Sequence, residues 1–448
     1  MLGTRGGAVA LAVVGALTLS GCGGSGDEKS SGDSSGKPAA VTVELPKLDG
    51  ETVQVSAVWS GSEQANFTKV LKEFEKRTGA KVTYVPAQDP IVNFLGTKIA
   101  GGSPPDVAML PQVGAIDEAV KRKWAKPAGA EAKAQLAKNY GKGWQELGAV
   151  DGTQYGVYFK AANKSLVWYN TAAFDNAGAS VPKTWKDFLT TAETISASGV
   201  APVSIGGADG WTLTDWFENI YLSQAGPEKY DQLTNREIKW TDPSVKDALT
   251  TLGELFGKPS LIAGGTQGAL QTEFPTSVTQ TFTGGDQPKS AMVFEGDFVG
   301  VNIADTKAKI GTDAKVFPFP AVGADSPVVT GGDAAVALKD TKGAQALLTF
   351  LASADAAKIA AESGGFISPN KSLDLAAYPN DVQRDIAKAL IDAGDNFRFD
   401  MSDQMLQSFG GTPGKGEWKA LQDFLKNPKD VAGTQKALED AAAKAYKS

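Results

Sequence analysis

Two pairs of acidic residues are the first candidates for chemistry in this chain. Glu295 lies two positions before Asp297, and Asp400 lies three positions before Asp403. Two carboxyl groups that flank a glycosidic bond can serve as acid and as base or nucleophile, which is the chemistry of glycoside hydrolases. Spacing along the chain does not place two carboxyl groups on one bond, and solvated surface acids are the commoner origin of such pairs.

Composition excludes most other catalytic arrangements. The chain contains no histidine and a single cysteine, Cys22, so it cannot build a Ser-His-Asp triad, a Cys-His pair or a structural zinc site. Ser368 and Lys371 have the Ser-x-x-Lys spacing of penicillin-recognising enzymes, but the elements that accompany it there are absent, and we treat the spacing as chance. Glycine motifs for nucleotides and calcium loops are absent as well. We therefore predict that the protein is not an enzyme and has no catalytic residue, metal or cofactor.

Aromatic residues offer a different kind of site. Trp168, Trp185, Trp216 and Trp418 fall on predicted apolar stripes or strand faces, so we assign them to packing. Trp211 lies off the apolar stripe of residues 213–220, at the start of its predicted helix, where its ring would face a cleft or solvent. An indole with a flat apolar face and a donor at its edge suits a sugar. A functionless surface tryptophan is about as common an explanation.

The charge of the chain argues against nucleic acid as a partner. There are 44 basic and 51 acidic side chains, which gives a net charge of −7. Such a molecule repels phosphate backbones, and no basic run interleaved with aromatic residues reverses that. The length of 448 residues, of which 42% are apolar, predicts a folded protein with two or three domains.

The N-terminus reads as an export signal. Arg5 precedes an apolar stretch over residues 8–19 that is too short to span a bilayer as a mature helix. It ends in Leu-Ser-Gly before Cys22, which resembles the processing box of bacterial lipoproteins. We predict a signal peptide over 1–21, a lipid on Cys22, a flexible Gly/Ser-rich tether over 22–40 and a location on the outer face of the cytoplasmic membrane. A plain signal peptide is the alternative.

The folded part begins with alternating strands and helices. Apolar periodicity predicts strands at 53–59, 82–85 and 106–110, with helices at 67–74 and 91–99 between them. This alternation is typical of a doubly wound parallel sheet. If the strand order is 2-1-3, the ligand crevice lies between the turns that carry Glu63 and Gln112. Further strands and helices up to residue 446 complete a mixed α/β body.

An ordered set of short fragments resembles a known family. The fragments are residues 59–63 (Trp-Ser-Gly-Ser-Glu), 74–79, 103–107, 151–157, 168–170, 182–185 and 291–296. Their types and order are similar to extracellular solute-binding proteins of carbohydrate ABC importers, the relatives of maltose-binding protein, over roughly 51–446. Residues 399–411 are similar to the branch that binds α-glucosides.

The resemblance implies a two-lobe periplasmic-binding-protein-like fold of type II. Each lobe would be a doubly wound mixed sheet flanked by helices, with the first lobe at 41–162 plus 322–367 and the second at 163–321 plus 368–448. Hinge strands would cross near Asn163, near Phe319 and near residues 366–369. The lobes would close around the ligand. A membrane permease would recognise the closed form, the ATPase would be a separate chain, and the protein would be a monomer.

The resemblance also implies site residues. Alignment on residues 169–170 puts Asn163 where maltose-binding protein has a sugar-contacting glutamate, and alignment on Gly296 puts Phe298 at a stacking tryptophan. The candidates for hydroxyl contacts or stacking are Glu63, Gln112, Asn163, Trp211, Glu295, Phe298 and Asp400. The expected function is capture of a neutral mono- or oligosaccharide for an ABC importer. An extracytoplasmic glycoside hydrolase and an adhesion or scaffold lipoprotein remain the alternatives.

Overall fold

The computed structural model describes residues 42–88, 90–323, 325–364, 366–393 and 397–447. The predicted signal peptide, Cys22 and the predicted tether lie outside these ranges. Two larger β-sheets, which belong to the same compact unit, organise the described residues. We call each sheet with its covering helices a lobe.

The first lobe contains the strand and helix alternation predicted near the N-terminus. Its sheet consists of β1 (Thr52–Ala57), β2 (Lys81–Pro86), β3 (Val107–Leu110), β6 (Gly156–Asn163), β11 (Val329–Ala337) and β12 (Arg398–Phe399). β1 pairs in parallel with β2 and with β3, so the predicted order 2-1-3 is confirmed. β11 extends the sheet antiparallel to β3 and also pairs with β6 and β12. A small hairpin of β4 (Ala149–Val150) and β5 (Thr153–Gln154) precedes β6.

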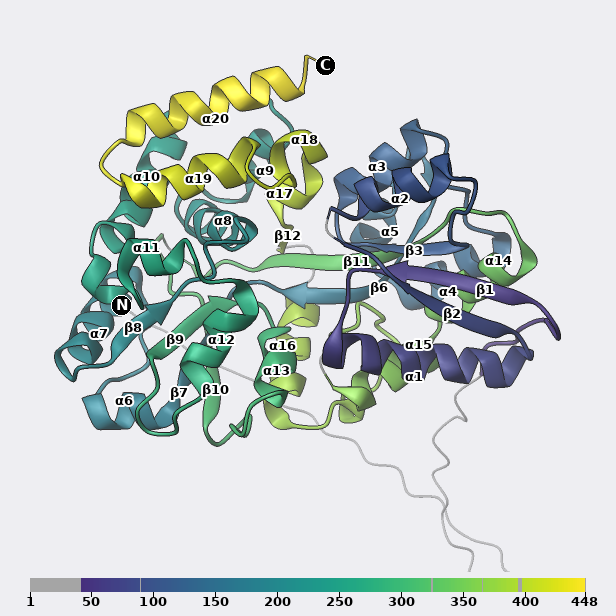
Figure 1. The fold of residues 1–448 in the computed structure, drawn as a ribbon, viewed down its shortest axis with the longest axis horizontal. Coiled ribbons are helices and arrows are strands. Elements are labelled where there is room, and N and C mark those ends of the chain that lie inside the picture. The colour runs from purple at the N-terminus through teal and green to yellow at the C-terminus, as the bar shows by residue number, and fades with distance from the viewer. Residues whose placement is uncertain (1–41, 89, 324, 365, 394–396, 448) are drawn as a thin grey trace, which may run out of the picture. The chain divides into compact units, whose positions relative to one another are not determined.

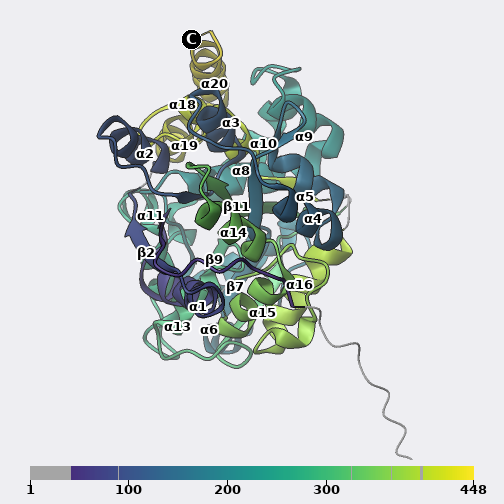
Figure 2. The same cartoon turned by 90° about the vertical axis from the view of Figure 1, so that its right-hand side faces the viewer.

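Helices cover both faces of this sheet. They are α1 (Gly61–Thr78), α2 (Ile91–Ala100), α3 (Val113–Lys121), α4 (Ala130–Asn139), α5 (Lys142–Leu147), α14 (Lys342–Leu351) and α15 (Ala354–Ser363). α2 and α3 lie above the strands in Figure 1, and α1 and α15 lie below them. Both views show α1 beside α15 (Figures 1 and 2). α1 buries the predicted stripe, including Phe67 and Phe74, and ends at Gly79, whose φ of 79° is left-handed.

The second lobe is built on a four-stranded mixed sheet. Its strands follow the order β10 (Ala314–Pro318), β7 (Leu166–Asn170), β9 (Ser290–Glu295), β8 (Ala201–Ser204). The helices of this lobe are α6 (Thr171–Ala177), α7 (Trp185–Ala197), α8 (Trp211–Ala225), α9 (Pro227–Thr234), α10 (Pro243–Phe256), η1 (Pro259–Leu261), α11 (Gly265–Ala269), α12 (Phe274–Phe282), α13 (Val299–Ala304), α17 (Met401–Gln404), α18 (Gln407–Gly410), α19 (Gly416–Lys426) and α20 (Val431–Ala445). Thr184 caps α7 as predicted, because its hydroxyl accepts from the Asp187 amide at 3.2 Å.

The chain passes between the two large sheets after β6 and again after β10. β6 ends at Asn163 and β7 begins at Leu166, so residues 164–165 form the first passage. The second passage joins β10 to β11, and the Phe319 amide donates to the Ser165 carbonyl at 2.8 Å across the two passages. Figure 1 shows β6 and β11 side by side between the two groups of helices.

The third passage lies later in the chain than predicted. Ile367 pairs with Ala161 of β6, and the Lys371 amide donates to the Asn139 carbonyl at 2.8 Å. η2 (Leu375–Ala377) then contacts α15, and α16 (Asp381–Asp392) contacts β6. The chain therefore stays with first-lobe elements beyond residues 366–369, where burial of Phe366 and Ile367 holds it. It reaches the second lobe through β12 and α17, and the other lobe boundaries stay predictions.

None of the helices within the described ranges combines the length and the apolar character that crossing a bilayer requires.

Candidate ligand-binding site

A cavity of about 240 Å³ lies between the two lobes. This is somewhat below the volumes, roughly 300–1,000 Å³, that hold small organic ligands. The cavity is lined by Val58, Trp59, Glu63, Pro111, Gln112, Lys160, Ala162, Lys164, Trp211, Phe274, Phe298, Gly331, Gly332, Asp333, Ser402, Asp403 and Trp418. Glu63 and Gln112 follow the carboxyl ends of β1 and β3, as the predicted crevice requires.

The floor of the cavity comes from the two long antiparallel strands. Lys160 and Ala162 lie on β6, and Gly331, Gly332 and Asp333 lie opposite on β11. A Cβ atom on Gly332 would lie 2.6 Å from the Lys160 carbonyl oxygen, too close for a side chain. The glycine therefore lets the strands pair closely beneath the cavity.

The second lobe contributes a group of aromatic rings. The ring of Trp211, the first residue of α8, lies 5.2 Å from Phe274 and 6.0 Å from Phe298, and the two phenyl rings are 5.3 Å apart. These spacings are typical of edge-to-face and tilted aromatic contacts. The three rings therefore pack against one another and form one wall of the cavity.

Trp418 adds a fourth aromatic ring from the second lobe. It lies in the first turn of α19 and packs against Gly210, where a Cβ atom would lie 2.9 Å from the Trp418 Cβ. We predicted Trp418 to be a packing residue only. It is buried, but it also lines the cavity, and its indole N–H has no acceptor among the described residues.

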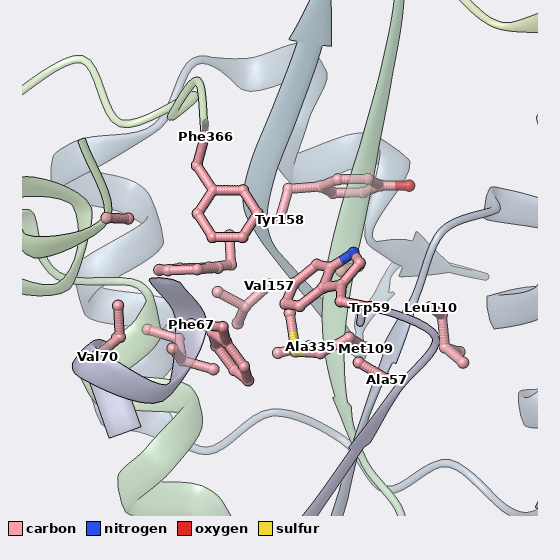
Figure 3. Packing of buried hydrophobic residues seen from close by; sticks show 14 of the residues in the cluster. Ala57, Trp59, Phe67, Val70, Met109, Leu110, Val157, Tyr158, Ala335 and Phe366 are labelled. Carbon is pink, nitrogen blue, oxygen red and sulfur yellow. The ribbon is translucent and has the colours of Figure 1, made fainter. Parts of the chain in front are cut away.

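The first lobe contributes Trp59. Its ring lies 5.0 Å from Phe67 in an edge-to-face contact and 5.3 Å from Phe366. Figure 3 shows these three rings together above the strands of the first lobe. The two lobes therefore both bring aromatic faces to the cavity.

Lys160 is a buried cation on the floor. Its Nζ atom lies 2.8 Å from a carboxylate oxygen of Glu63 and 3.6 Å from Asp333. It also lies 5.5 Å from the ring of Trp59 and 5.8 Å from that of Phe298. Burial alone would lower the pKa of Lys160, but the two carboxylates outweigh burial and raise it. Lys160 is therefore charged and already paired.

Lys164 forms a second ionic cluster at the first passage between the lobes. Its Nζ atom lies 3.0 Å from Asp215, forms an ion pair with Asp400, and is 3.9 Å from Asp403. Burial raises the pKa of Asp400, but the Lys164 ammonium outweighs it and holds that pKa at about 2. Burial raises the pKa of Asp215 to about 7. The cluster joins the hinge to α8 and α17 of the second lobe.

Four of the seven predicted site residues line the cavity, namely Glu63, Gln112, Trp211 and Phe298. Gln112 also accepts a hydrogen bond from Gln407 of α18, which links the two lobes at the cavity rim. Glu63 and Gln112 were predicted from the strand order, and Trp211 was predicted from its position off an apolar stripe.

The other three predicted residues lie behind the lining. The Asn163 amide donates to Asp297 at 2.6 Å, and its side-chain oxygen accepts from the Ser165 amide at 3.1 Å. Asp400 holds Lys164 and caps α17. Glu295 is almost completely buried, and no donor among the described residues reaches its carboxyl oxygens. These residues organise the hinge side of the site.

The two acidic pairs do not form a catalytic pair in the cavity. Of their four residues, only Asp403 contributes to the lining. Asp297 binds the hinge backbone. Burial and the Asp215 charge raise the pKa of Glu295 well above its ordinary value, so Glu295 keeps its proton. The arrangement therefore does not provide two predicted carboxyl groups on opposite sides of one bound sugar.

Three buried carboxylates, Asp215, Glu218 and Asp400, each place an oxygen within 4.8 Å of the others. Lys164 already forms ion pairs with two of them, Asp215 and Asp400. Glu218 accepts from the Met401 and Ser402 amides at 2.6 and 3.0 Å and from Tyr230. Lys164 and the backbone of α17 therefore already occupy the space around most of these oxygens, and the group does not resemble an open cation site.

Sequence reasoning missed several lining residues. They are Trp59, Lys160, Lys164, Phe274, Asp333 and Trp418. A signal for the lysines existed, because Lys160 interrupts a strand that is buried at every residue and buried charges need a partner. No sequence pattern marks Phe274 as a cavity residue, because it lines the cavity only through the contact between the starts of α12 and α8.

Comparisons with known proteins fit this geometry. Residues 59–358 match the family model described as bacterial extracellular solute-binding protein. The osmoprotective compounds-binding protein GgtB of Synechocystis sp. is 33% identical over 386 residues, which cover 84% of this chain and 89% of that protein. The alpha-glucosides-binding periplasmic protein AglE of Rhizobium meliloti is 33% identical over 411 residues, 88% of each chain.

A solved structure supports the fold. The bacterial solute receptor AcbH, which has an exclusive substrate preference for b-D-galactopyranose, matches with a TM-score of 0.76 at 19% identity and covers 88% of this chain and 99% of its own. The predicted two-lobe α/β fold is thereby confirmed. With both relatives aligned over most of their length, the chain belongs to the family of bacterial extracellular solute-binding proteins.

Proposed function

We propose that this protein is the substrate-binding component of an ABC-type sugar importer and that it captures a neutral α-glucoside without altering it. One observation carries the proposal: aromatic rings from both lobes and hydrogen-bonding carboxylates meet in a single cavity. Rings match the apolar faces of a pyranose, and carboxylates accept hydrogen bonds from its hydroxyl groups.

The relatives support the choice of ligand class. AglE binds alpha-glucosides and GgtB binds osmoprotective compounds. Each is 33% identical to this chain over most of its length. An α-glucoside agrees with the ligand in the name of AglE, and the small volume of the cavity favours one with few rings.

Four residues make the proposed contacts predicted from the sequence. Trp211 and Phe298 offer ring faces, and Glu63 and Gln112 offer polar atoms from the first lobe. We propose that Asn163, Glu295 and Asp400 position the site from behind, through the hinge backbone, Asp215 and Lys164.

The proposed receptor works with partners outside this chain. A permease in the membrane would recognise the closed lobes, and a separate ATPase would supply energy. We propose that the mature protein is a monomer that starts at Cys22, carries a lipid there, and stands on the outer face of the cytoplasmic membrane on the tether of residues 22–40. Membership in an extracellular family supports the compartment.

Calorimetric titration tests the ligand class. The panel contains trehalose, sucrose, maltose, methyl α-D-glucopyranoside, a β-glucoside, a galactoside and a xyloside, each recovered afterwards for mass spectrometry. We expect saturable heat from α-glucosides and an unchanged mass. A panel that gives no saturable heat would overturn the proposal, and hydrolysis products that accumulate with time would establish the glycoside hydrolase alternative instead.

A further inference from the structure

We propose that the cavity selects its ligand by charge: it accepts uncharged and ammonium-bearing glycosides, rejects those that carry a carboxylate or phosphate, and does so through Asp333. The inference rests on the proposed function, because it concerns the ligand of the same cavity.

The cations of the cavity are already engaged. Lys160 and Lys164 are the positively charged groups among the described lining residues. Lys160 pairs with Glu63 at 2.8 Å and Asp333 at 3.6 Å. Lys164 is held by two buried aspartates and by Asp403. An anionic ligand would therefore find no unpaired ammonium group to replace the water that it gives up.

Carboxyl groups outnumber these cations. Glu63, Asp333 and Asp403 line the cavity, and Asp215 and Asp400 stand directly behind Lys164 with no exposed surface. Burial and the charge of Asp400 already raise the pKa of Asp403 well above its ordinary value. Asp403 therefore favours its protonated form, because a further negative charge beside Asp400 is disfavoured. The carboxylate or phosphate of a ligand would be disfavoured for the same reason.

The carboxylates that line the cavity favour ligands with hydrogen-bond donors. Ionised carboxylates only accept hydrogen bonds, so sugar hydroxyl groups and ammonium groups both match them. The cavity already contains two ammonium groups next to aromatic rings. The Lys160 Nζ atom lies 5.5 Å from the centre of the Trp59 ring, and the Lys164 Nζ atom lies 5.5 Å from that of the Trp211 ring. A ligand ammonium would meet the same aromatic faces and carboxylates.

A matched set of ligands tests the selectivity by calorimetry on the full chain. The set contains methyl α-D-glucopyranoside and its 6-amino-6-deoxy, 6-carboxylate and 6-phosphate derivatives. We expect the neutral and amino compounds to bind within about tenfold of each other and both anions to bind at least about thirtyfold more weakly than the neutral compound.

Three calorimetric results would overturn the charge selectivity. A smaller penalty for either anion overturns the charge selectivity alone. An amino derivative that binds as poorly as the anions also overturns it, because the penalty would then come from size. Failure of the neutral glucoside to bind overturns the α-glucoside proposal, and this inference with it.

Variants assign the selectivity to its residues. Asp333→Asn should reduce the penalty of the anions, relative to the neutral compound, by at least about threefold, because it removes the carboxylate 3.6 Å from the Lys160 ammonium. The control is Asp247→Asn on the exposed face of α10, which changes the net charge equally but lies outside the cavity. An equal effect of Asp247→Asn, or no effect of a folded cavity variant, would contradict the assignment.

Discussion

Trp211 lines the cavity and offers a ring that can stack on a ligand. It begins α8, lies against Phe274 and Phe298, and has the Lys164 ammonium 5.5 Å from its ring. We expect Trp211→Ala to weaken binding of the α-glucoside by ~1–3 kcal/mol, since a large apolar face is lost. Calorimetry measures the change. Trp124→Ala, which removes a tryptophan that does not line the cavity, should leave the affinity unchanged, and an unchanged affinity in folded Trp211→Ala would remove Trp211 from the site.

Glu295 makes the stability of the protein depend on pH. Its ordinary pKa is 4.5, and burial, followed by the Asp215 charge, raises it in the folded protein. Between these two values the unfolded chain loses a proton that the folded protein keeps. The contribution of Glu295 to stability is therefore full below about 4.5 and is lost as the pH rises toward the folded-state pKa.

Glu295→Gln should remove this loss, because glutamine stays uncharged. We expect thermal unfolding to give similar melting temperatures for variant and wild type near pH 4.5 and a growing advantage of the variant as the pH rises. Glu146→Gln on the exposed face of α5 is the control. A difference between Glu295→Gln and wild type that stays constant over the whole pH range would contradict the assigned protonation.

The residues of the site could be predicted only in part. Glu63 and Gln112 follow from strand order, because loops at the carboxyl ends of adjacent strands meet at one edge. Trp418 could not be separated from core residues, because its stripe on α19 is shared by buried Leu421 and Phe424. Periodicity shows which face of a helix is buried, but it does not show whether that face meets a core or a cavity.

At the scale of elements, α3 of the first lobe contacts α17 of the second lobe. Gly114 of α3 lies so near Met405, directly after α17, that a Cβ atom would lie 2.2 Å from the Met405 carbonyl oxygen. Gly114 is helical and its φ is not positive, so alanine suits its own helix. A side chain at position 114 would therefore collide with the second lobe and not with α3 itself.

Gly114→Ala should hinder the approach of the lobes without unfolding either one. We expect at least about a tenfold loss of α-glucoside affinity with little change in melting temperature, because the closed population falls. Gly143→Ala on α5 is the matched control, since a Cβ atom there makes only ordinary contact with Phe397. A Gly114→Ala variant that binds as tightly as wild type would show that this contact is unnecessary for binding.

The order of strands and helices along the chain could be predicted from the sequence better than which elements pack against one another. Alternating strands and helices, the Gly79 stop and the Thr184 cap follow from local chemistry. The third passage was predicted too early, because residues 366–369 resemble a crossing but Phe366 and Ile367 stay buried with the first lobe. Which lobe buries an apolar segment is decided by long-range packing.

At the scale of the whole molecule, the predicted lipid on Cys22 determines where the receptor works. Cys22→Ser should move the protein from the membrane fraction to the soluble extracytoplasmic fraction, because its only cysteine is lost and a lipid is needed for anchoring. Fractionation and intact mass measure both effects. The affinity for the α-glucoside should not change, and a Cys22→Ser protein that remains with the membrane would contradict the anchor.

We expect the two lobes to hold an intact neutral glycoside in the cavity between them. A crystal structure of the protein grown with trehalose would show the ligand in place. We expect electron density for the unbroken disaccharide in the cavity, with one ring against Trp211 and its hydroxyl groups within hydrogen-bonding distance of Asp333 or Asp403. Density for separated glucose units, or for the sugar bound elsewhere with this cavity empty, would contradict it.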